Sequence, residues 1–173
     1  EKWQMAGITF TAGRYCPNAS MASEAGSASM RRLASTGASW VSIVVTQYQH
    51  AVNSTSIFPL YNGSAVMDPG GYYEFVTIRE EELRHAIRSA HSLGLKVMLK
   101  PHVDLLYTAC KPGFSRCSPG HNGLYWRGDI GGCYPQDAHD TPFSAQAWEA
   151  WFGSYERFLL PYAKLAAEEG AEM

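Results

Sequence analysis

The sequence lacks the features that mark several large classes of protein. No apolar run approaches the ~20 residues needed to span a bilayer, so we expect no membrane insertion. Lysine and arginine total 14 against 16 aspartate and glutamate, a formal net charge of −2, which gives no reason to expect nucleic acid as a partner. The first expected strand is followed by Thr11-Ala12-Gly13-Arg14 and not by G-x-G-x-x-G, so dinucleotide binding has no support and we expect no cofactor.

The sequence has no Cys-x-x-Cys pair, which disfavours a zinc site. All four cysteines fall in polar stretches rich in glycine and proline: Cys16, Cys110, Cys117 and Cys133. An even number of cysteines in loops is typical of disulfides formed in an oxidising compartment. Four cysteines allow three pairings. Our choice joins Cys110 to Cys117, which closes a short loop containing proline and glycine and leaves Cys16 for Cys133.

Three N-x-S/T sequons, at Asn18, Asn53 and Asn62, lie in expected loops. The chain begins at Glu1 without a methionine or an apolar leader, so we expect either that a leader was removed or that the chain is a segment of a longer protein. The sequons and the loop cysteines together predict a secreted or extracellular glycoprotein. Such a protein could also act at the cell surface or in the extracellular matrix.

What is present is a regular alternation of strands and helices. The expected units are strand 7–11 with helix 27–36, strand 40–46 with helix 77–93, and strand 96–104 with helix 144–169. Such alternation predicts a parallel sheet with right-handed crossovers. Long loops follow the strands, at about 47–76 and 105–143, whereas the returns from helix to strand are short; this asymmetry is typical of a (β/α)8 TIM barrel. A doubly wound sheet would show the same asymmetry of loop lengths, but that fold favours a glycine-rich first turn, which this sequence lacks.

The loops and helices carry more specific expectations. The Asp-Pro-Gly-Gly run at 68–71 predicts a turn within an otherwise irregular loop. Thr77 and Glu80 fit a capping box at the start of the second helix. The third helix should be kinked or locally broken by Pro161. Its expected core-facing stripe consists of Trp148, Phe152, Tyr155, Leu159, Tyr162 and Ala166.

A complete barrel of this type needs about 250 residues, and here the sequence stops after the third helix. Three units alone leave open sheet edges. We therefore expect residues 1–173 to be the N-terminal part of a single (β/α)8 domain, supplying about its first three βα units and truncated before strand four. The remainder of the same barrel is then the expected partner.

The third expected strand, KVMLKPHVD at 96–104, ends in ionisable residues. Alternation along a strand sets Met98, Lys100, His102 and Asp104 on one face and the intervening apolar residues on the other. The apolar set suits packing against helices, so the polar set should turn inward at the carboxyl end, where a barrel binds its substrate. There Asp104 can orient His102 by accepting its ring N–H. The other strands end in a similar way, in Thr9 and Thr11, and in Thr46 and Tyr48.

Two other interpretations of this strand end stay open. Lys100 and Asp104 can form a structural ion pair beside a satisfied histidine. A metal site can instead use His102 and Asp104 together with His121, or with His139 and Asp140. No fixed ligand spacing supports a metal, so we expect none. A metal-dependent barrel hydrolase would lose activity or stability on chelation.

The last long loop contains an indole and a guanidinium group side by side, in Trp126 and Arg127. A tryptophan face stacks on the C–H face of a pyranose, and arginine donates hydrogen bonds to hydroxyl groups. The pair therefore indicates sugar binding. The alternative is that Trp126 anchors its loop by packing on the rim of the barrel.

Five phrases, in order along the whole chain, carry a resemblance to a known family. They are GITFT (7–11), WVSIVVTQYQ (40–49), HSLGLKVMLKPHVD (91–104), WRGDI (126–130) and WEAWFGSY (148–155). Together they resemble glycoside hydrolase family 113, with KPHVD and the following WRG as the most specific part. The cysteine-rich insert at 105–124, the lengthened loop at 50–76 and Pro161 depart from the pattern of that family.

The resemblance implies a (β/α)8-barrel, retaining β-mannanase with two glutamates about 5 Å apart, one acid/base and one nucleophile, after strands four and seven. Both lie beyond Met173, so we expect no catalytic residue in this chain; Glu172 belongs at the base of the next strand, on the wrong side. The implied substrate is an extracellular polysaccharide of mannan or glucomannan type. The implied substrate-binding residues are Tyr48, Lys100, His102, Asp104, Trp126 and Arg127. The alternative is a catalytically inactive glycosidase-like module with a glycan-binding or structural role.

Overall fold

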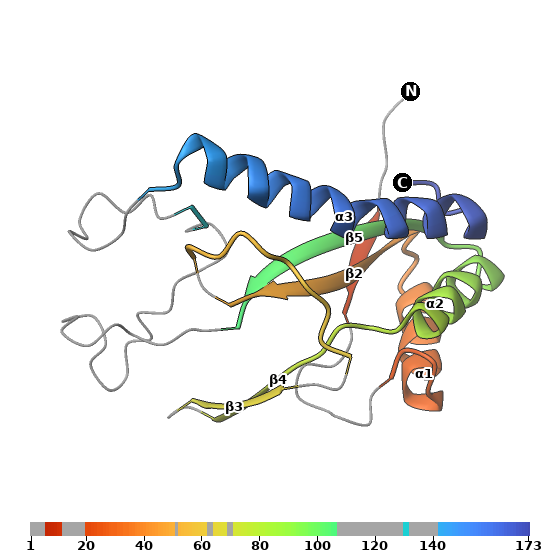
Figure 1. Ribbon diagram of the computed structural model, residues 1–173. Coiled ribbons are helices and arrows are strands. Elements are labelled where there is room, and N and C mark those ends of the chain that lie inside the picture. Colours follow the sequence, from red (N-terminus) through yellow and green to blue (C-terminus); the bar gives the residue numbers. More distant parts are fainter. Residues whose placement is uncertain are drawn as a thin grey trace.

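The computed structural model describes residues 6–11, 20–50, 52–61, 64–68, 71–106, 130–131 and 142–173, and for 64–68 and 71–75 it describes the backbone alone. The elements follow in the order β1 (Gly7–Phe10), α1 (Glu24–Ser35), β2 (Trp40–Gln49), β3 (Ser64–Asp68), β4 (Gly71–Phe75), α2 (Glu80–Ser92), β5 (Lys96–Leu105) and α3 (Ala145–Glu169) (Figure 1). The three predicted strand–helix units are confirmed.

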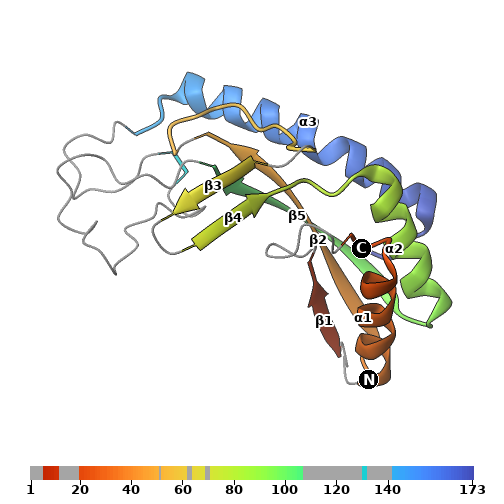
Figure 2. The same cartoon turned by 90° about the horizontal axis from the view of Figure 1, so that it is seen from below.

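The strands β1, β2 and β5 form one sheet in that order, and both pairings are parallel, as the alternation of elements predicts. In register, Gly7 lies beside Trp40 and Trp40 beside Lys96, so all three strands begin at the same edge. Figures 1 and 2 show α1, α2 and α3 along one face of this sheet, with α3 running beside β2 and β5. The carboxyl ends of β2 and β5 therefore meet at the opposite edge.

The core lies between the helices and the odd-numbered residues of β2. Val41, Ile43 and Val45 are completely buried, and they share one apolar cluster with Leu83 and Ile87 of α2. Burial of aliphatic side chains from both layers is the main term that favours this packing. Odd-numbered positions of β2 thus face the helices, and even-numbered positions face away from them.

Toward its carboxyl end the helix-facing side of β2 becomes polar. Gln47 Nε2 donates a hydrogen bond to the Tyr162 hydroxyl oxygen at 3.2 Å, and Trp151 Nε1 donates to Gln49 Oε1 at 2.8 Å. Both glutamines are buried. Because a buried amide loses its contacts with water, these two bonds to α3 replace them.

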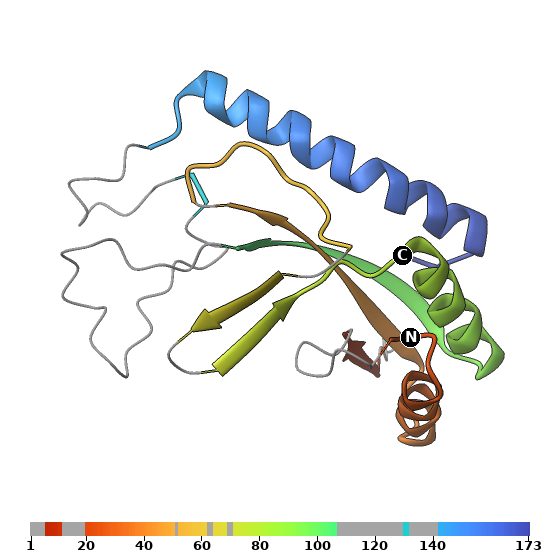
Figure 3. The same cartoon turned by 60° about the horizontal axis from the view of Figure 1, so that its bottom comes forward.

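The prediction that residues 47–76 form one irregular loop is wrong in part, because this range contains regular strands. Strand β2 continues to Gln49, and β3 and β4 form an antiparallel hairpin closed by Asp68 and Gly71, at the predicted turn (Figure 3). A two-stranded hairpin is stabilised mainly by pairing and by what it packs on, so its sequence signal is weak. In Figures 1 and 3 the hairpin and α3 lie on opposite sides of β2 and β5.

The predicted capping box of the second helix is also wrong. Helix α2 begins after Arg79, whose backbone N–H donates to Glu82 Oε2 at 3.2 Å. Thr77 is buried instead: its hydroxyl donates to the Thr46 carbonyl at 2.8 Å and accepts the Leu60 N–H at 2.9 Å. Thr77 therefore joins β2 to the chain that enters α2, which leaves it no role at the helix end.

Helix α3 has the predicted span, and its predicted core stripe is confirmed in part: Tyr162 is buried, and Tyr155 and Leu159 pack against the core. Its buried residues are Trp151, Ser154, Phe158, Tyr162 and Leu165. Phe152, predicted in the core stripe, is 57% exposed. The helix runs unbroken through Pro161, and burial of Phe158 and Tyr162 on either side holds it together across the missing hydrogen bond. No helix in the described part of the chain, α3 included, is long and apolar enough to cross a membrane.

The backbone N–H groups of β5 alternate between two neighbours. At the start of the strand, Lys96 donates to the Ser39 carbonyl at 3.0 Å, on the side of β2. Leu99 donates to the Met173 carbonyl at 2.8 Å, on the other edge. Pro101 occupies an odd-numbered position like Leu99. Its missing N–H therefore costs β5 no bond to β2, which explains how a proline fits inside this strand.

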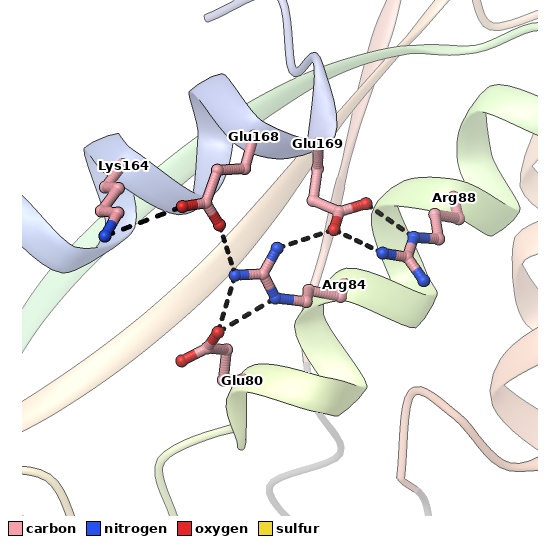
Figure 4. A network of polar contacts seen from close by, with 6 residues as sticks. All are labelled: Glu80, Arg84, Arg88, Lys164, Glu168 and Glu169. Carbon is pink, nitrogen blue, oxygen red and sulfur yellow. Dashed lines mark hydrogen bonds and ion pairs between the residues drawn. The ribbon is translucent and has the colours of Figure 1, made fainter.

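An ion-pair network joins α2 to the last turn of α3 (Figure 4). Arg84 contacts Glu80 at 2.7 Å, Glu168 at 2.6 Å and Glu169 at 2.7 Å, and Arg88 contacts Glu169 at 2.7 Å. The Glu169 side chain is 6% exposed. Hydrogen bonds from Arg88 and then Arg84 lower the pKa of Glu169 from 4.5 to about 2. The network stabilises the helix layer.

Candidate functional site

The polar residues predicted on β5 share a face with the end of β2. In register, Thr46 lies beside His102 and Tyr48 beside Asp104. Neighbours in a parallel sheet point to the same face, and the odd-numbered residues face the helices, so these even-numbered side chains turn away from the helices. Lys100 has the same parity. We call this helix-free side of β2 and β5 the inner face; it gathers these residues toward the carboxyl end of the sheet.

The predicted residues on the inner face differ in accessibility. Lys100 is exposed, and His102 and Asp104 are half-buried. Tyr48 is 5% exposed, and its hydroxyl donates to the Val76 carbonyl at 3.0 Å. Tyr48 thus helps to anchor the chain that enters α2, and Lys100, His102 and Asp104 are the members that present surface to a ligand.

The strand itself separates these groups. At a rise of about 3.3 Å per residue, Lys100 and Asp104 are about 13 Å apart along the backbone, with His102 midway. This spacing disfavours a direct Lys100–Asp104 ion pair. Asp104 Oδ1 accepts the backbone N–H of Leu105 at 3.1 Å, which orients the carboxylate. The hydrogen bond from the His102 ring to Asp104 stays a prediction.

Ser42 is an inner-face residue that the sequence did not single out. It lies in register with Thr9 of β1 and Met98 of β5. It is 9% exposed, and its Oγ has no hydrogen-bond partner among the residues that the structure describes. Phe10 packs against the core under the helices, and Thr9 is on the opposite side of β1. This agrees with the prediction that Thr9 points to the inside of the barrel. The sequence did contain a signal for Ser42: it is a hydroxyl residue at an even-numbered position of an otherwise aliphatic strand, which indicates the inner face.

The segment at 52–60, which we call the β2 wall, lies beside the carboxyl end of β2. Its Phe58 exchanges two backbone hydrogen bonds with Tyr48, at 2.9 and 2.8 Å. Ile57 N–H donates to Ser154 Oγ at 2.9 Å, and Ser154 is a buried residue of α3. The rings of His50 and Phe58 have centroids 4.7 Å apart. The wall is therefore held by both β2 and α3, through contacts too distant in sequence to predict.

Other predicted site residues lie outside the described residues. They are Trp126 and Arg127, the cysteines Cys16, Cys110, Cys117 and Cys133, the sequons at Asn18 and Asn62, and His121, His139 and Asp140. Asn53 is described: it is exposed and lies in the turn after β2. Within the described ranges, no three His, Cys, Asp or Glu side chains group closely enough to hold a metal ion.

Glu172 lies at the other end of β5 from the polar cluster. Its Oε2 accepts the backbone N–H of Val97 at 2.8 Å and is 3.4 Å from His91 Nε2. Val97 is the second residue of β5, whereas Asp104 is next to its last. Glu172 is thus at the amino end of the strand, as predicted, and cannot reach a ligand held over Asp104.

A sequence model of Glycoside Hydrolase Family 113 matches residues 9–173. The chain belongs to Glycoside Hydrolase Family 113. The matched range contains every element from α1 to α3 and all residues of the inner face named above.

Solved structures of family 113 proteins are similar to this chain. The β-mannanase AaManA from Alicyclobacillus acidocaldarius, in complex with ManMIm, is 27% identical with a TM-score of 0.64. A β-1,4-mannanase structure is 25% identical with a TM-score of 0.66, and a complex of a β-1,4-mannanase is 24% identical with a TM-score of 0.63. The alignments cover 98% of this chain and 42–43% of theirs. No curated protein matches the chain.

Membership of family 113 explains the layered arrangement. The parallel β1-β2-β5 sheet, with its three helices on one face, is part of a (β/α)8 barrel. Its inner face is then the inside of the barrel, and the carboxyl ends of the strands are the edge at which barrels of this type bind their substrates. The chain spans less than half the length of these family 113 relatives.

Proposed function

We propose that the protein is a glycoside hydrolase that cleaves mannan-type, β-linked polysaccharides. The family 113 match over residues 9–173 carries this proposal. The similarity to solved β-mannanases supports the choice of substrate. Lys100, His102 and Asp104 add a chemical reason, because an ammonium group donates to sugar hydroxyls and a carboxylate accepts from them.

The proposed mechanism is retaining, with two glutamates supplied by sequence that follows Met173. One glutamate protonates the leaving oxygen, and the other forms a covalent glycosyl–enzyme intermediate that water then hydrolyses. The residues on the inner face hold the sugar unit next to the scissile bond: Asp104 accepts from its hydroxyls and Lys100 donates to them. Trp126 and Arg127 extend the same subsite in this proposal.

The decisive experiment is an assay of the protein with a complete barrel on mannan, glucomannan and cellulose oligosaccharides. We expect cleavage of mannan and glucomannan, and NMR of the first product should show the β-anomer, because a retaining mechanism keeps the configuration. A first product in the α-configuration would contradict retention. Binding of the oligosaccharides without any product would favour the inactive glycan-binding module.

We also propose that the protein acts outside the cell. The sequons, with the exposed Asn53 among them, and the four loop cysteines support this. Disulfides Cys110–Cys117 and Cys16–Cys133 would stiffen the loops that follow the strands. A peptide mass map of unreduced protein that found free thiols at these positions would contradict the pairing.

A further inference from the structure

Gly131 lies where segments that are far apart in sequence meet. Its N–H donates to the Val52 carbonyl at 2.9 Å, and its own carbonyl accepts the Phe143 N–H at 2.9 Å. Val52 is the first residue of the β2 wall, and Phe143 directly precedes Ser144, the N-cap of α3. Gly131 therefore ties the β2 wall to the start of α3.

Two independent constraints at this point require a glycine. The backbone has φ +94°, in the region that L-residues with a side chain rarely adopt. A Cβ atom at this position would lie 2.4 Å from Trp148 Cζ2 and 2.6 Å from Trp148 Cη2, far inside the contact distance of two carbon atoms.

The Trp148 ring is half-buried and packs against three other aromatic rings. Its centroid is 5.0 Å from that of Phe143, 6.0 Å from that of Trp151 and 5.8 Å from that of Phe152. Trp151 is in turn hydrogen-bonded to the buried Gln49. An added methyl group at residue 131 would therefore force the Trp148 ring or Gly131 to shift, and either movement would strain the joint at the bond to Val52.

The joint is connected to the candidate site by a short chain of contacts. The β2 wall reaches Tyr48 through the paired backbone bonds of Phe58, and Tyr48 lies beside Asp104 in the sheet. We propose that Gly131 is a positioning residue for substrate binding: its joint holds the β2 wall at the distance that a sugar unit bound over Asp104 requires. The identity of the ligand as a sugar rests on the proposed function.

The test compares Gly131→Ala with Gly94→Ala in the protein with a complete barrel. Gly94 also has positive φ, at +76°, but nothing lies within 4 Å of its Cβ position, and it follows α2 at the amino edge of the sheet. Both variants place a side chain at positive φ. We expect Gly131→Ala to raise KM for mannan oligosaccharides about tenfold or more with kcat within about threefold, because a displaced wall weakens binding in ground and transition states alike. Gly94→Ala should leave both constants unchanged.

Hydrogen exchange supplies a readout that needs no substrate. In Gly131→Ala the amides of the β2 wall should exchange faster than in wild type, with those of β5 unchanged, and Gly94→Ala should not show this. If Gly131→Ala folds poorly, the double variant with Trp148→Leu restores room for the methyl group, and its wall should exchange more slowly than that of Gly131→Ala alone.

Equal KM values in the two glycine variants would overturn the substrate role, and equal exchange in the wall would overturn the joint itself. A wild-type protein that neither cleaves nor binds mannan oligosaccharides would contradict the proposed function. Even then, the exchange comparison decides whether Gly131 holds the wall.

Discussion

Lys100 and Lys96 are a natural pair for a test of the inner face. Both have the same parity on β5, but Lys100 lies toward the carboxyl end and Lys96 at the start, over the Trp40 ring at 5.5 Å. We expect Lys100→Ala to lower kcat/KM on mannan oligosaccharides about ten- to a hundredfold, the cost of one hydrogen bond from a charged group. Lys96→Ala should stay within about twofold. Equal losses in both would show that Lys100 does not touch the substrate.

At the scale of residues, the sequence identifies side chains whose direction is set locally. Lys100, His102 and Asp104 follow from strand alternation alone, since parity within one strand decides their face. Tyr48 was predicted to bind substrate, yet its hydroxyl is engaged by the Val76 carbonyl. Ser154, which supports the β2 wall through Ile57, could not be predicted, because its role depends on a partner about a hundred positions away.

At the scale of elements, α3 contains a proline that the helix tolerates. We expect Pro161→Ala to raise the free energy of unfolding by about 1–3 kcal/mol, because it restores a backbone donor in a helix that is already continuous. Urea denaturation measures the change, with the neighbouring exposed Leu160→Ala as control. A destabilised Pro161→Ala would mean that the packing of α3 depends on the local geometry that the proline imposes.

The link between α2 and α3 should depend on pH. The folded-state pKa of Glu169 lies below its ordinary value of 4.5, at about 2, so its charge stabilises the fold fully above pH 4.5. That contribution is lost as the pH falls toward 2. Between about pH 5 and pH 2, wild type should therefore lose more stability than Glu169→Gln.

Thermal unfolding across this pH range measures the difference. The control is Glu24→Gln, which removes an exposed ion pair to Arg31 within α1. Parallel stability curves for wild type and Glu169→Gln would contradict a role for the Glu169 carboxylate.

The elements themselves were largely predictable, and their exceptions have physical causes. The three strands and three helices follow from apolar spacing, and Gly37, Gly94 and Gly170 all have positive φ just after their helices. The buried face of α3 was predicted in part: Tyr162 is in the core, but Phe152 is exposed. Aromatic residues occur almost all round this helix, so their spacing alone does not select one face. Thr77 was misjudged because its hydroxyl bonds to the Thr46 carbonyl, a tertiary partner that competes with capping.

At the scale of the whole molecule, the extracellular proposal makes a prediction about Asn53. When a eukaryotic cell secretes the protein, Asn53→Gln should reduce its mass by one glycan, because the sequon is exposed in the turn after β2. Mass spectrometry before and after endoglycosidase treatment measures this. Asn122→Gln, outside any sequon, is the matched control. An unmodified wild-type Asn53 in such secreted protein would contradict the prediction.

The barrel architecture was predictable from one global asymmetry, the long loops after strands and the short returns after helices, because it reflects which sheet edge carries function. The way in which the segments beyond the end of β2 are joined was not. The β2 wall, Gly131 and the start of α3 come together through contacts across the fold, and neither composition nor periodicity contains that information.

Pro101 bears on how the protein avoids faulty association while it folds. Beyond Leu99, the next β5 position that would offer an N–H on the edge away from β2 is Pro101, and it has none. Before a strand has paired with this edge of β5, Pro101 makes it a poorer template for strand addition by other molecules. The proline between Lys100 and His102, itself on the helix-facing side of β5, should thus lower the risk of aggregation during synthesis.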